Sequence, residues 1–565
     1  MESAAPTEKP QKQDKERKDQ KAAAKAQKAA AHNQQSAGGG KKKADDMALI
    51  GITVAKADDL SEWYQQVILK GKMLAFTDIP GCYIYQPASY RIWEFIQDFF
   101  NARIRKMKVK NCYFPLFISE ANLQREKEHI EGFAAEVAWV TEGGKNKLEK
   151  RLAVRPTSET AMYSFYSQEI RSHRDLPLKM NQWNNVVRWE FKHPMPFLRS
   201  REFLWQEGHT AHLTQEEAGK EVLEILDHYA SIYEDLLAVP VVKGTKTKNE
   251  QFPGADYTTT IEGFIPAVGR GIQAATSHCL GQHFAKMFDI RVEDPNQKVK
   301  EGEARDKIYV WQNSWGFTTR SIGIMVLIHG DDKGLVIPPR VAEIQVIIVP
   351  VGVTAKMKDA DKEALYDQVE SVRRTLEDAD VRVEVDYRET YNTGYKFNDW
   401  EMKGVPLRLE FGPKDAAKGV VTSSRRDIPD PAASKAELPI SSIATAVPAL
   451  LEQIQNDMFA RASAEYAAHR IIVREWKDFV PALNDKNVIL VPHCTEGECE
   501  DEIKKDSAGV QAEGQEVDVR APSMGAKSLC IPAEQPEGGI KEGMKCVNPK
   551  CGKEAKMWVM FGRSY

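Results

Sequence analysis

Arginine side chains gather in one stretch of this sequence, within a predicted hairpin. Arg188 lies in the first predicted strand, residues 185–191, and Arg199 lies where the chain returns into the second, residues 199–207. A guanidinium stays charged at any relevant pH and presents a planar fork of donors, so several of them directed into one pocket suit a phosphate or a carboxylate. The alternative is a surface hairpin whose charges are solvated. The interleaved aromatic residues favour the pocket: Trp189, Phe191, Phe203 and Trp205.

Two further segments carry polar side chains that could contact a ligand. Residues 151–160 run from a predicted strand into a predicted helix, which Thr157 or Ser158 could cap. A helix start after a strand can also hold a small ligand, and the residues alone leave both interpretations open. In residues 269–281, small residues let the backbone approach a ligand, and three side chains supply polar contacts: Gln273, Thr276 and His278.

Four of the eight cysteines form two pairs with equal spacing. Cys494 and Cys499 make the first pair, and Cys546 and Cys551 make the second. In a reducing compartment, two such pairs fit a tetrahedral Cys₄ zinc site, which is structural because it leaves no open position. The alternative is a set of unpaired thiols. The remaining cysteines are expected to serve packing, except for Cys530, which lacks a partner at metal-binding spacing.

The elements that must position these residues follow from hydrophobic periodicity. Ile92, Phe95, Ile96 and Phe99 predict an amphipathic helix over residues 88–108, followed by a strand over 109–118 that Pro115 interrupts. After the hairpin, we expect a helix over 216–237 and strands over 256–262 and 309–313. Residues 316–323 then enter an apolar helix with Arg320 near its start, where the helix dipole favours anions.

The second half of the chain has a different pattern. Strands over 344–349, 381–385 and 407–411 alternate with helices over 365–376 and 393–400, which predicts a small α/β domain. Aromatic and basic residues suit this domain to single-stranded RNA: Tyr395, Lys396, Arg425 and Arg426. Composition alone does not distinguish it from a nucleotide-binding or protein-docking module. A long helix from residue 441 through Tyr466 leads into the cysteine-containing segment.

Length and composition set the frame for these predictions. The chain has 565 residues and a net charge of −4, so nucleic-acid binding would have to come from local basic patches. No apolar run approaches the roughly 20 residues of a membrane span, and the lysine-rich amino terminus has no secretory signal. Residues 1–46 are expected to be a disordered, Lys/Ala-rich tail. The cysteine content favours a cytoplasmic protein.

Taken in order, these segments resemble the three motifs of class II aminoacyl-tRNA synthetases. Motif one is the helix and strand with Pro115, motif two is the strand with Arg188 returning through Arg199, and motif three is residues 316–323 with Arg320. Further segments look like those of prolyl-tRNA synthetases of the eukaryotic and archaeal type. These are Arg155-Pro-Thr-Ser-Glu159, Ala275-Thr-Ser-His278 and the ending Phe561-Gly-Arg-Ser-Tyr565.

The resemblance implies an enzyme that ligates L-proline to tRNA(Pro) through a prolyl-adenylate made from ATP. Arg188 and Arg320 would be catalytic, since positioned cations stabilise the charge that develops on the phosphoryl oxygens. The implied proline site is Thr157, Glu159, Arg188, Phe203, Trp205 and His278. The implied ATP site is Arg188, Trp189, Arg199, Ser200, Gln273, Thr276, Thr318 and Arg320, with Mg²⁺ near Gln273 and structural Zn²⁺ on Cys494, Cys499, Cys546 and Cys551.

The family also implies an architecture. We expect a class II catalytic domain at 47–335, with an antiparallel sheet flanked by helices, an α/β anticodon-binding domain at 340–440 and a small zinc-binding domain at 441–565. The protein would be a homodimer that does not insert into membranes. Two rival interpretations are a catalytically inactive paralogue that only binds RNA and a synthetase for another amino acid. The phosphate-facing arginines argue against the first, and Thr157, Glu159, Trp205 and His278 as a group argue against the second.

Overall fold

We describe the protein from a computed structural model, which covers residues 51–123, 136–190, 193–298, 300, 304–354, 356–508 and 525–565. The chain divides into two units, residues 1–53 and 54–565, and all elements below belong to the second. The predicted tail, residues 1–46, lies outside the described residues, as does Phe191. Among the described helices, none is long and apolar enough to cross a membrane.

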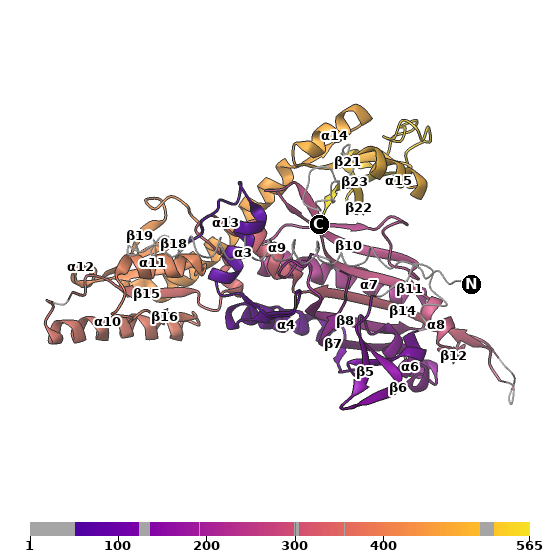
Figure 1. Ribbon diagram of the computed structural model, residues 1–565, viewed down its shortest axis with the longest axis horizontal. Coiled ribbons are helices and arrows are strands. Elements are labelled where there is room, and N and C mark those ends of the chain that lie inside the picture. Colours follow the sequence, from indigo (N-terminus) through magenta and orange to yellow (C-terminus); the bar gives the residue numbers. More distant parts are fainter. Residues whose placement is uncertain are drawn as a thin grey trace, which may run out of the picture. The chain divides into compact units, whose positions relative to one another are not determined.

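The main element is an 11-stranded sheet with the strand order β20-β21-β23-β22-β9-β10-β11-β14-β8-β7-β3 (Figure 1). Its central antiparallel strands come from the middle of the chain, and β3 adds to one edge in parallel. The strands are β3 (Lys110–Asn111), β7 (Leu178–Val187), β8 (Glu202–His212), β9 (Val242–Thr245), β10 (Tyr257–Ile265), β11 (Arg270–Gly281), β14 (Trp311–Thr318), β20 (Arg470–Ile472), β21 (Val488–His493), β22 (Lys527–Pro532) and β23 (Met557–Ser564).

Helices pack their apolar faces against this sheet. They are α4 (Pro87–Lys106), α7 (Gln215–Ser231), extended by a π-helical turn, η2 (Ile232–Leu236), and α9 (Arg320–His329). Trp93 of α4 stacks on Phe317 with 5.3 Å between ring centroids, and Phe100 stacks on Tyr229 at 5.2 Å. The predicted helix is confirmed, but Phe95 and Phe99 lie at the margin of its buried face, under arginine guanidinium groups.

The strand predicted over 109–118 is instead divided. Its first residues form β3, and the rest pair through β4 (Phe117–Ser119) with β6 (Asn146–Val154) in a small sheet completed by β5 (Trp139–Gly143). The helix after β6 is α6 (Glu159–Glu169). The prediction of a side-chain cap there was wrong, because the Ser158 hydroxyl donates to Glu207 and the Thr157 hydroxyl donates to Glu159.

A second sheet confirms the predicted α/β region. Its strand order is β16-β15-β17-β18-β19, and its strands are β15 (Val346–Pro350), β16 (Val383–Val385), β17 (Leu407–Phe411), β18 (Val420–Arg425) and β19 (Lys435–Pro439). The helices are α10 (Asp359–Asp378), α11 (Thr393–Met402), α12 (Pro413–Lys418) and α13 (Ile443–Ala468). The first half of α13 shares a buried cluster with this sheet, through Ile443, Val447 and Leu451. The same helix runs from this region toward α14 (Figure 1) and ends two residues before β20.

The carboxy-terminal segment returns to the main sheet. β23 pairs with β21 and β22, and its last residues run parallel to the start of β11. The Tyr565 backbone N–H donates to the Gly271 carbonyl at 3.2 Å, so the last residue of the chain lies beside the start of β11. Two helices, α14 (Trp476–Asn484) and α15 (Gly497–Asp506), complete this part.

The remaining described elements are short or peripheral. They are α3 (Leu60–Lys70), β1 (Leu74–Phe76), β2 (Tyr83–Tyr85), η1 (His173–Asp175), α8 (His283–Met287), β12 (Arg291–Glu293), β13 (Lys307–Tyr309), η3 (Pro339–Val341), η4 (Ile440–Ser442) and η5 (Pro536–Gly538).

Gly208 provides a test of the packing between β8 and β14. A Cβ at this position would lie 2.1–2.3 Å from three ring atoms of buried Trp315. We therefore expect Gly208→Ala to lower the free energy of unfolding by about 1–3 kcal/mol or more, as overpacking does. Gly219→Ala on α7 is the control, because its nearest contact is an ordinary 3.5 Å. Denaturant unfolding that shows equal stability for the two variants would contradict this packing.

Candidate active site

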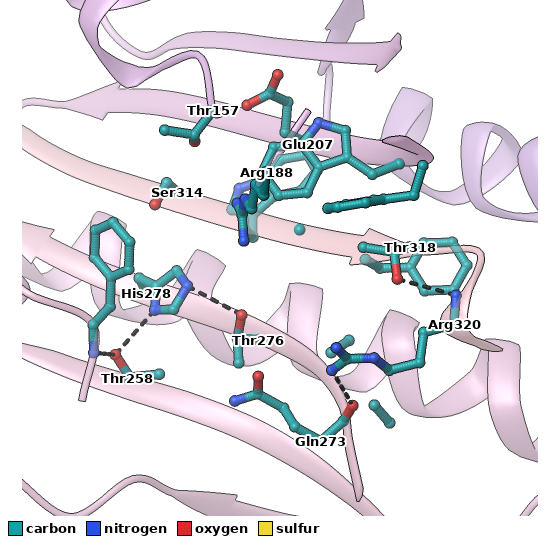
Figure 2. A pocket seen from close by; sticks show the side chains of 18 of the residues that line it. Thr157, Arg188, Glu207, Thr258, Gln273, Thr276, His278, Ser314, Thr318 and Arg320 are labelled. Atoms are coloured by element: carbon teal, nitrogen blue, oxygen red, sulfur yellow. Dashed lines mark hydrogen bonds between the residues drawn. The ribbon is translucent and has the colours of Figure 1, made fainter. Parts of the chain in front are cut away.

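A cavity of about 400 Å³ opens on the main sheet, between β8, β11 and β14. Figure 2 shows Thr157, Arg188 and Glu207 on one side and Gln273, Thr276 and His278 on the other, with Arg320 reaching in from the start of α9. The antiparallel register explains the convergence, because Trp205 lies opposite Thr318 on one side and Asn184 on the other. Strands distant in sequence therefore present neighbouring side chains to one space.

Eleven of the predicted ligand-binding residues line this cavity. They are Thr157, Glu159, Arg188, Ser200, Phe203, Trp205, Gln273, Thr276, His278, Thr318 and Arg320. Trp189 and Arg199 are not among the lining residues. Trp189 is exposed and has the Arg201 guanidinium over its ring, whereas Arg199 forms a backbone bridge with Met195. The roles assigned to these two residues stay predictions.

Two arginines are held in the cavity by backbone carbonyl groups. Arg188 Nε donates to the Pro156 carbonyl at 2.9 Å, and its guanidinium lies 5.1 Å from the Trp205 ring centroid. Arg320 donates to the carbonyl groups of Leu198, at 3.3 Å, and Gln273, at 3.4 Å. Among the described residues, no carboxylate oxygen lies within 4.0 Å of Arg188, Arg199 or Arg320.

The three guanidinium groups also repel one another. Burial is the main cause of the lowered pKa of Arg320, and the charges of Arg199 and Arg188 lower it further. A guanidinium group keeps its positive charge at neutral pH. A half-buried cavity with positive charge and no carboxylate partner for that charge favours an anionic ligand.

Glu207 and His209 form a buried polar network that sequence reasoning missed. The Glu207 carboxylate accepts hydrogen bonds from the side chains of Ser158, Gln182 (2.7 Å) and Asn184 (2.9 Å). Burial raises the pKa of Glu207, but its hydrogen bonds, led by that from His209, lower it more, so the net shift is downward. The alternation of β8 places both residues on one face, but no local pattern indicates which distant side chains partner them.

His278 is a neutral polar group in the cavity wall. Its two ring nitrogens face the hydroxyl groups of Thr258, at 2.9 Å, and Thr276, at 3.0 Å. Burial, with a smaller contribution from His209, lowers the pKa of His278 to about 3. Phe252 covers the imidazole with 4.7 Å between centroids. This side of the cavity therefore combines an uncharged imidazole with an aromatic ring.

Four residues that line the cavity have a buried polar atom without a hydrogen-bond partner in the described part of the chain. These atoms are Ser200 Oγ, Trp205 Nε1, Ser314 Oγ and Trp315 Nε1. A buried polar atom without a partner is energetically unfavourable, so a ligand that offered one would be stabilised there.

The four predicted zinc ligands come together from two distant segments. Cys494 and Cys551 have their sulfur atoms 3.5 Å apart, and those of Cys499 and Cys546 are 3.7 Å apart. Four thiolates around one zinc ion at about 2.3 Å would lie about 3.8 Å from each other, so these two distances are compatible with the ion. Cys551 lies outside the group of Cys494, Cys499, Cys546 and His493, whose donor atoms are all within 4.8 Å of one another. A hydrogen bond from Cys499 lowers the pKa of Cys546 to about 5. His493 joins the cluster, with a ring nitrogen within 4.8 Å of three of the sulfur atoms.

Two glutamates near these cysteines, Glu496 and Glu500, are engaged by other residues. Glu496 forms an ion pair with Lys556 at 2.7 Å, and Glu500 accepts hydrogen bonds from Thr247 and Ser528. The contact from Glu500 ties α15, which carries Cys499, to the strand region that follows β9. The cysteine cluster is thus connected to the main sheet and not isolated from it.

The prediction that four residues form an RNA-binding surface was wrong for three of them. Lys396 is buried and donates to the Asp386 carbonyl, Arg425 is paired with Asp427 and Asp457, and Arg426 is paired with Asp331. The charged groups of these three side chains are bound by other residues of the protein and do not face solvent. The fourth member, Tyr395, stacks on exposed Tyr391 with 4.2 Å between centroids and 10° between ring planes.

Comparisons with known families assign three parts of the chain. Residues 139–329 match "tRNA synthetase class II core domain (G, H, P, S and T)", residues 345–450 match "Anticodon binding domain" and residues 476–565 match "Prolyl-tRNA synthetase, C-terminal".

Individual relatives agree with these matches. A relative from Schizosaccharomyces pombe is 56% identical over 92% of this chain and 72% of its own length. The cytoplasmic proline–tRNA ligase of Arabidopsis thaliana is 51% identical over 91% of both chains. The crystal structure of prolyl-tRNA synthetase from Cryptosporidium parvum, complexed with halofuginone and AMPPNP, has 48% identity and a TM-score of 0.83, covering 92% of this chain and all of that one. This chain therefore belongs to the prolyl-tRNA synthetases, which are class II aminoacyl-tRNA synthetases.

Proposed function

We propose that this protein ligates L-proline to tRNA(Pro) for protein synthesis, in two steps through a prolyl-adenylate, consuming ATP and releasing AMP and pyrophosphate. The observation that carries the proposal is the cavity in which Arg188 and Arg320 lack carboxylate partners while aromatic rings form one wall. Both an amino-acid carboxylate and a phosphate are anions, and this cavity offers each a guanidinium.

In the first step, the carboxylate of proline attacks the α-phosphate of ATP. Arg188 would bridge these two anions, because its fixed Nε leaves the outer nitrogens of the fork directed into the cavity. Arg320 would stabilise the phosphates from the opposite end, near Thr318. Both charges are in place before the reaction, so they stabilise the transition state without reorganisation. We assign no general base, because a carboxylate is already a nucleophile.

The proline site would lie between Thr157 and His278. Glu159 and the Thr157 hydroxyl can face a secondary ammonium, and Phe203, Trp205 and the neutral imidazole of His278 can enclose an apolar ring. Glu207 lies on the same side, with a carboxylate oxygen within 4.8 Å of one from Glu159. Two buried carboxylates at this distance favour a cationic ligand group between them.

The ATP site would occupy the other end of the cavity. Ser200, Gln273, Thr276, Thr318 and Arg320 line it, and the solved Cryptosporidium relative was crystallised with AMPPNP, an adenine nucleotide. Mg²⁺ would reach Gln273 together with the phosphates, because magnesium is commonly held by substrate phosphates and few protein ligands.

The second step transfers the prolyl group to the terminal ribose of tRNA. The adenylate is already activated, so the cavity needs only to hold it while the ribose hydroxyl attacks. The Tyr391–Tyr395 stack, within the region that matches anticodon-binding domains, offers an exposed aromatic face on which an unpaired base could stack.

We also propose the finer features that the family implies. A homodimer is supported by exposed apolar side chains around motif one: Phe76, Ile79, Ile84, Tyr113 and Phe117. Zinc, if bound by the four cysteines, would cross-link residues 494–499 to 546–551 and would take no part in the reaction. We retain the domain limits 47–335, 340–440 and 441–565 and a cytoplasmic location as proposals.

The first test concerns Arg188. We expect Arg188→Ala to lower proline-dependent ATP–pyrophosphate exchange by about 10³-fold or more, as loss of a phosphate-facing arginine does in other phosphoryl transfers. Arg291→Ala, which removes an exposed arginine paired with Asp289, should exchange normally. Exchange by Arg188→Ala at the parental rate, in a folded protein, would refute the assignment.

The second test concerns the charge of His278. The pKa of His278 is about 3 in the folded protein, below its ordinary value of 6.5. The imidazole therefore binds a proton more readily in the unfolded chain. Its contribution to stability is therefore present above pH 6.5 and is lost as the pH falls toward 3. Histidine-selective NMR should show a neutral ring for His278 at pH 5, with His278→Asn identifying the signal. A titration midpoint near 6.5 would contradict the buried geometry.

The third test concerns zinc. Cys499→Ser should reduce the zinc content measured by elemental analysis and destabilise the carboxy-terminal part, because a site that lacks one thiolate cannot remain closed. Cys82→Ser, outside the cluster, should retain the parental metal content. Parental protein purified without chelators and free of zinc would remove the basis of this proposal.

A further inference from the structure

A buried ion pair joins the end of the motif-three helix to the α/β region. The Arg426 guanidinium binds the Asp331 carboxylate through both terminal nitrogens, at 2.7 and 2.5 Å. The Arg426 side chain is 3% exposed and that of Asp331 is 31% exposed. A planar fork on a carboxylate fixes direction as well as distance, so this contact is more restrictive than a single hydrogen bond.

Asp331 is connected to the active site through the helix α9. It follows α9, whose first residue is Arg320 in the cavity wall. Its carbonyl accepts a hydrogen bond from Trp63 Nε1 at 3.0 Å, and Lys56 Nζ donates to the neighbouring Gly330 carbonyl at 2.8 Å. The carboxy-terminal end of α9 is therefore fixed by several independent contacts.

Arg426 is connected to the opposite side in the same way. Its Nε donates to the Glu401 carbonyl at 2.8 Å, in the last turn of α11, and its backbone N–H donates to the Pro406 carbonyl at 2.9 Å. The same α11 carries Tyr395, which stacks on Tyr391. One side chain thus binds both the helix that carries Tyr395 and the segment directly after the helix that bears Arg320.

The surrounding contacts at this junction are backbone hydrogen bonds. Leu335 N–H donates to the Met402 carbonyl at 3.0 Å, and Ile337 N–H donates to the Gly404 carbonyl at 3.2 Å. Gly334, with φ of +131°, lets the two segments of the chain lie close together, because a Cβ at this position would lie 2.7–2.8 Å from the Met402 backbone. These bonds set the spacing of the two segments, and the ion pair adds a directional restraint.

We propose that Arg426 and Asp331 are positioning residues for the transfer step, which hold the RNA-binding α/β region in the one orientation that brings the 3′ end of tRNA(Pro) to the cavity. The inference rests on the proposed function. The 3′ end of a tRNA lies far from its anticodon. A small rotation at the junction between the two regions would therefore displace the 3′ end by a larger distance. Misplacement of reacting groups by about 1 Å can slow a reaction about 100-fold.

Neither residue contacts the reacting groups, so their substitution should affect one step alone. For Arg426→Gln we expect parental rates of proline-dependent pyrophosphate exchange and a parental dissociation constant for tRNA(Pro). Single-turnover transfer of proline from preformed adenylate to tRNA should slow about 10- to 100-fold. Arg426→Gln is the primary variant because Asp331, being partly exposed, can be hydrated when its partner is lost.

Two further variants separate positioning from a general loss of structure. The double variant Arg426→Gln/Asp331→Asn should transfer no more slowly than the slower single variant, because residues that act as one unit are not additive. Glu452→Gln, which breaks the exposed Arg340–Glu452 pair between η3 and α13, should leave transfer unchanged. Thermal unfolding should confirm that each variant is folded.

The possible outcomes are distinct. Transfer at the parental rate by folded Arg426→Gln would overturn the inference. A parallel decrease in exchange and transfer would also overturn it and show that the pair supports the cavity directly. A larger dissociation constant for tRNA(Pro), with a normal rate of transfer at saturating tRNA, would assign the pair to RNA binding instead. Failure of the parental protein to catalyse proline-dependent exchange would refute the proposed function itself.

Discussion

The cavity depends on arginine side chains that keep an unneutralised positive charge in a half-buried site. A nearby carboxylate would neutralise Arg188 or Arg320 and compete with any anionic ligand. The chain uses backbone carbonyl groups instead: Pro156 for Arg188, and Leu198 and Gln273 for Arg320. A carbonyl accepts a hydrogen bond and fixes direction, but it carries no net charge. Of these carbonyl groups, only that of Gln273 belongs to a sheet strand, whereas Pro156 precedes α6 and Leu198 lies between β7 and β8.

Much of this arrangement was predictable from local sequence, because the relevant signal is local. Arginines interleaved with aromatic residues in the predicted hairpin indicated a pocket, and the alternation of β8 placed Phe203, Trp205 and Glu207 on one face. In β11, alternation alone would put Gln273 and Thr276 on opposite faces, and the bulge at Ala274 brings both to the cavity. The cysteine pairs were also predictable, since a metal site constrains spacing within each pair. In these cases the chemistry requires particular residues a few positions apart.

The parts that were missed depend on partners far away in the sequence. Glu207 could not be recognised as a buried, ionised group, because its donors include Ser158 and Gln182, which reach it only after β7 and α6 are packed. Lys396 and Arg426 were assigned to an RNA surface because composition does not reveal which charges are paired. Arg426 is paired across 95 positions of sequence.

The position of β23 has a consequence for how the chain folds during synthesis. Its pairing of Arg563 with Arg270 of β11 closes a loop of about 290 residues. At a synthesis rate of about 5–20 residues per second, the edge of β11 waits about 15–60 s for this partner. During that time, the edge at Arg270 and Gly271 is available for incorrect pairing with other chains, whereas residues 275–281 of β11 are covered by β14. Nascent chains on neighbouring ribosomes would therefore be most prone to aggregate in this interval, which is when a chaperone that covers exposed strand edges would be of most use.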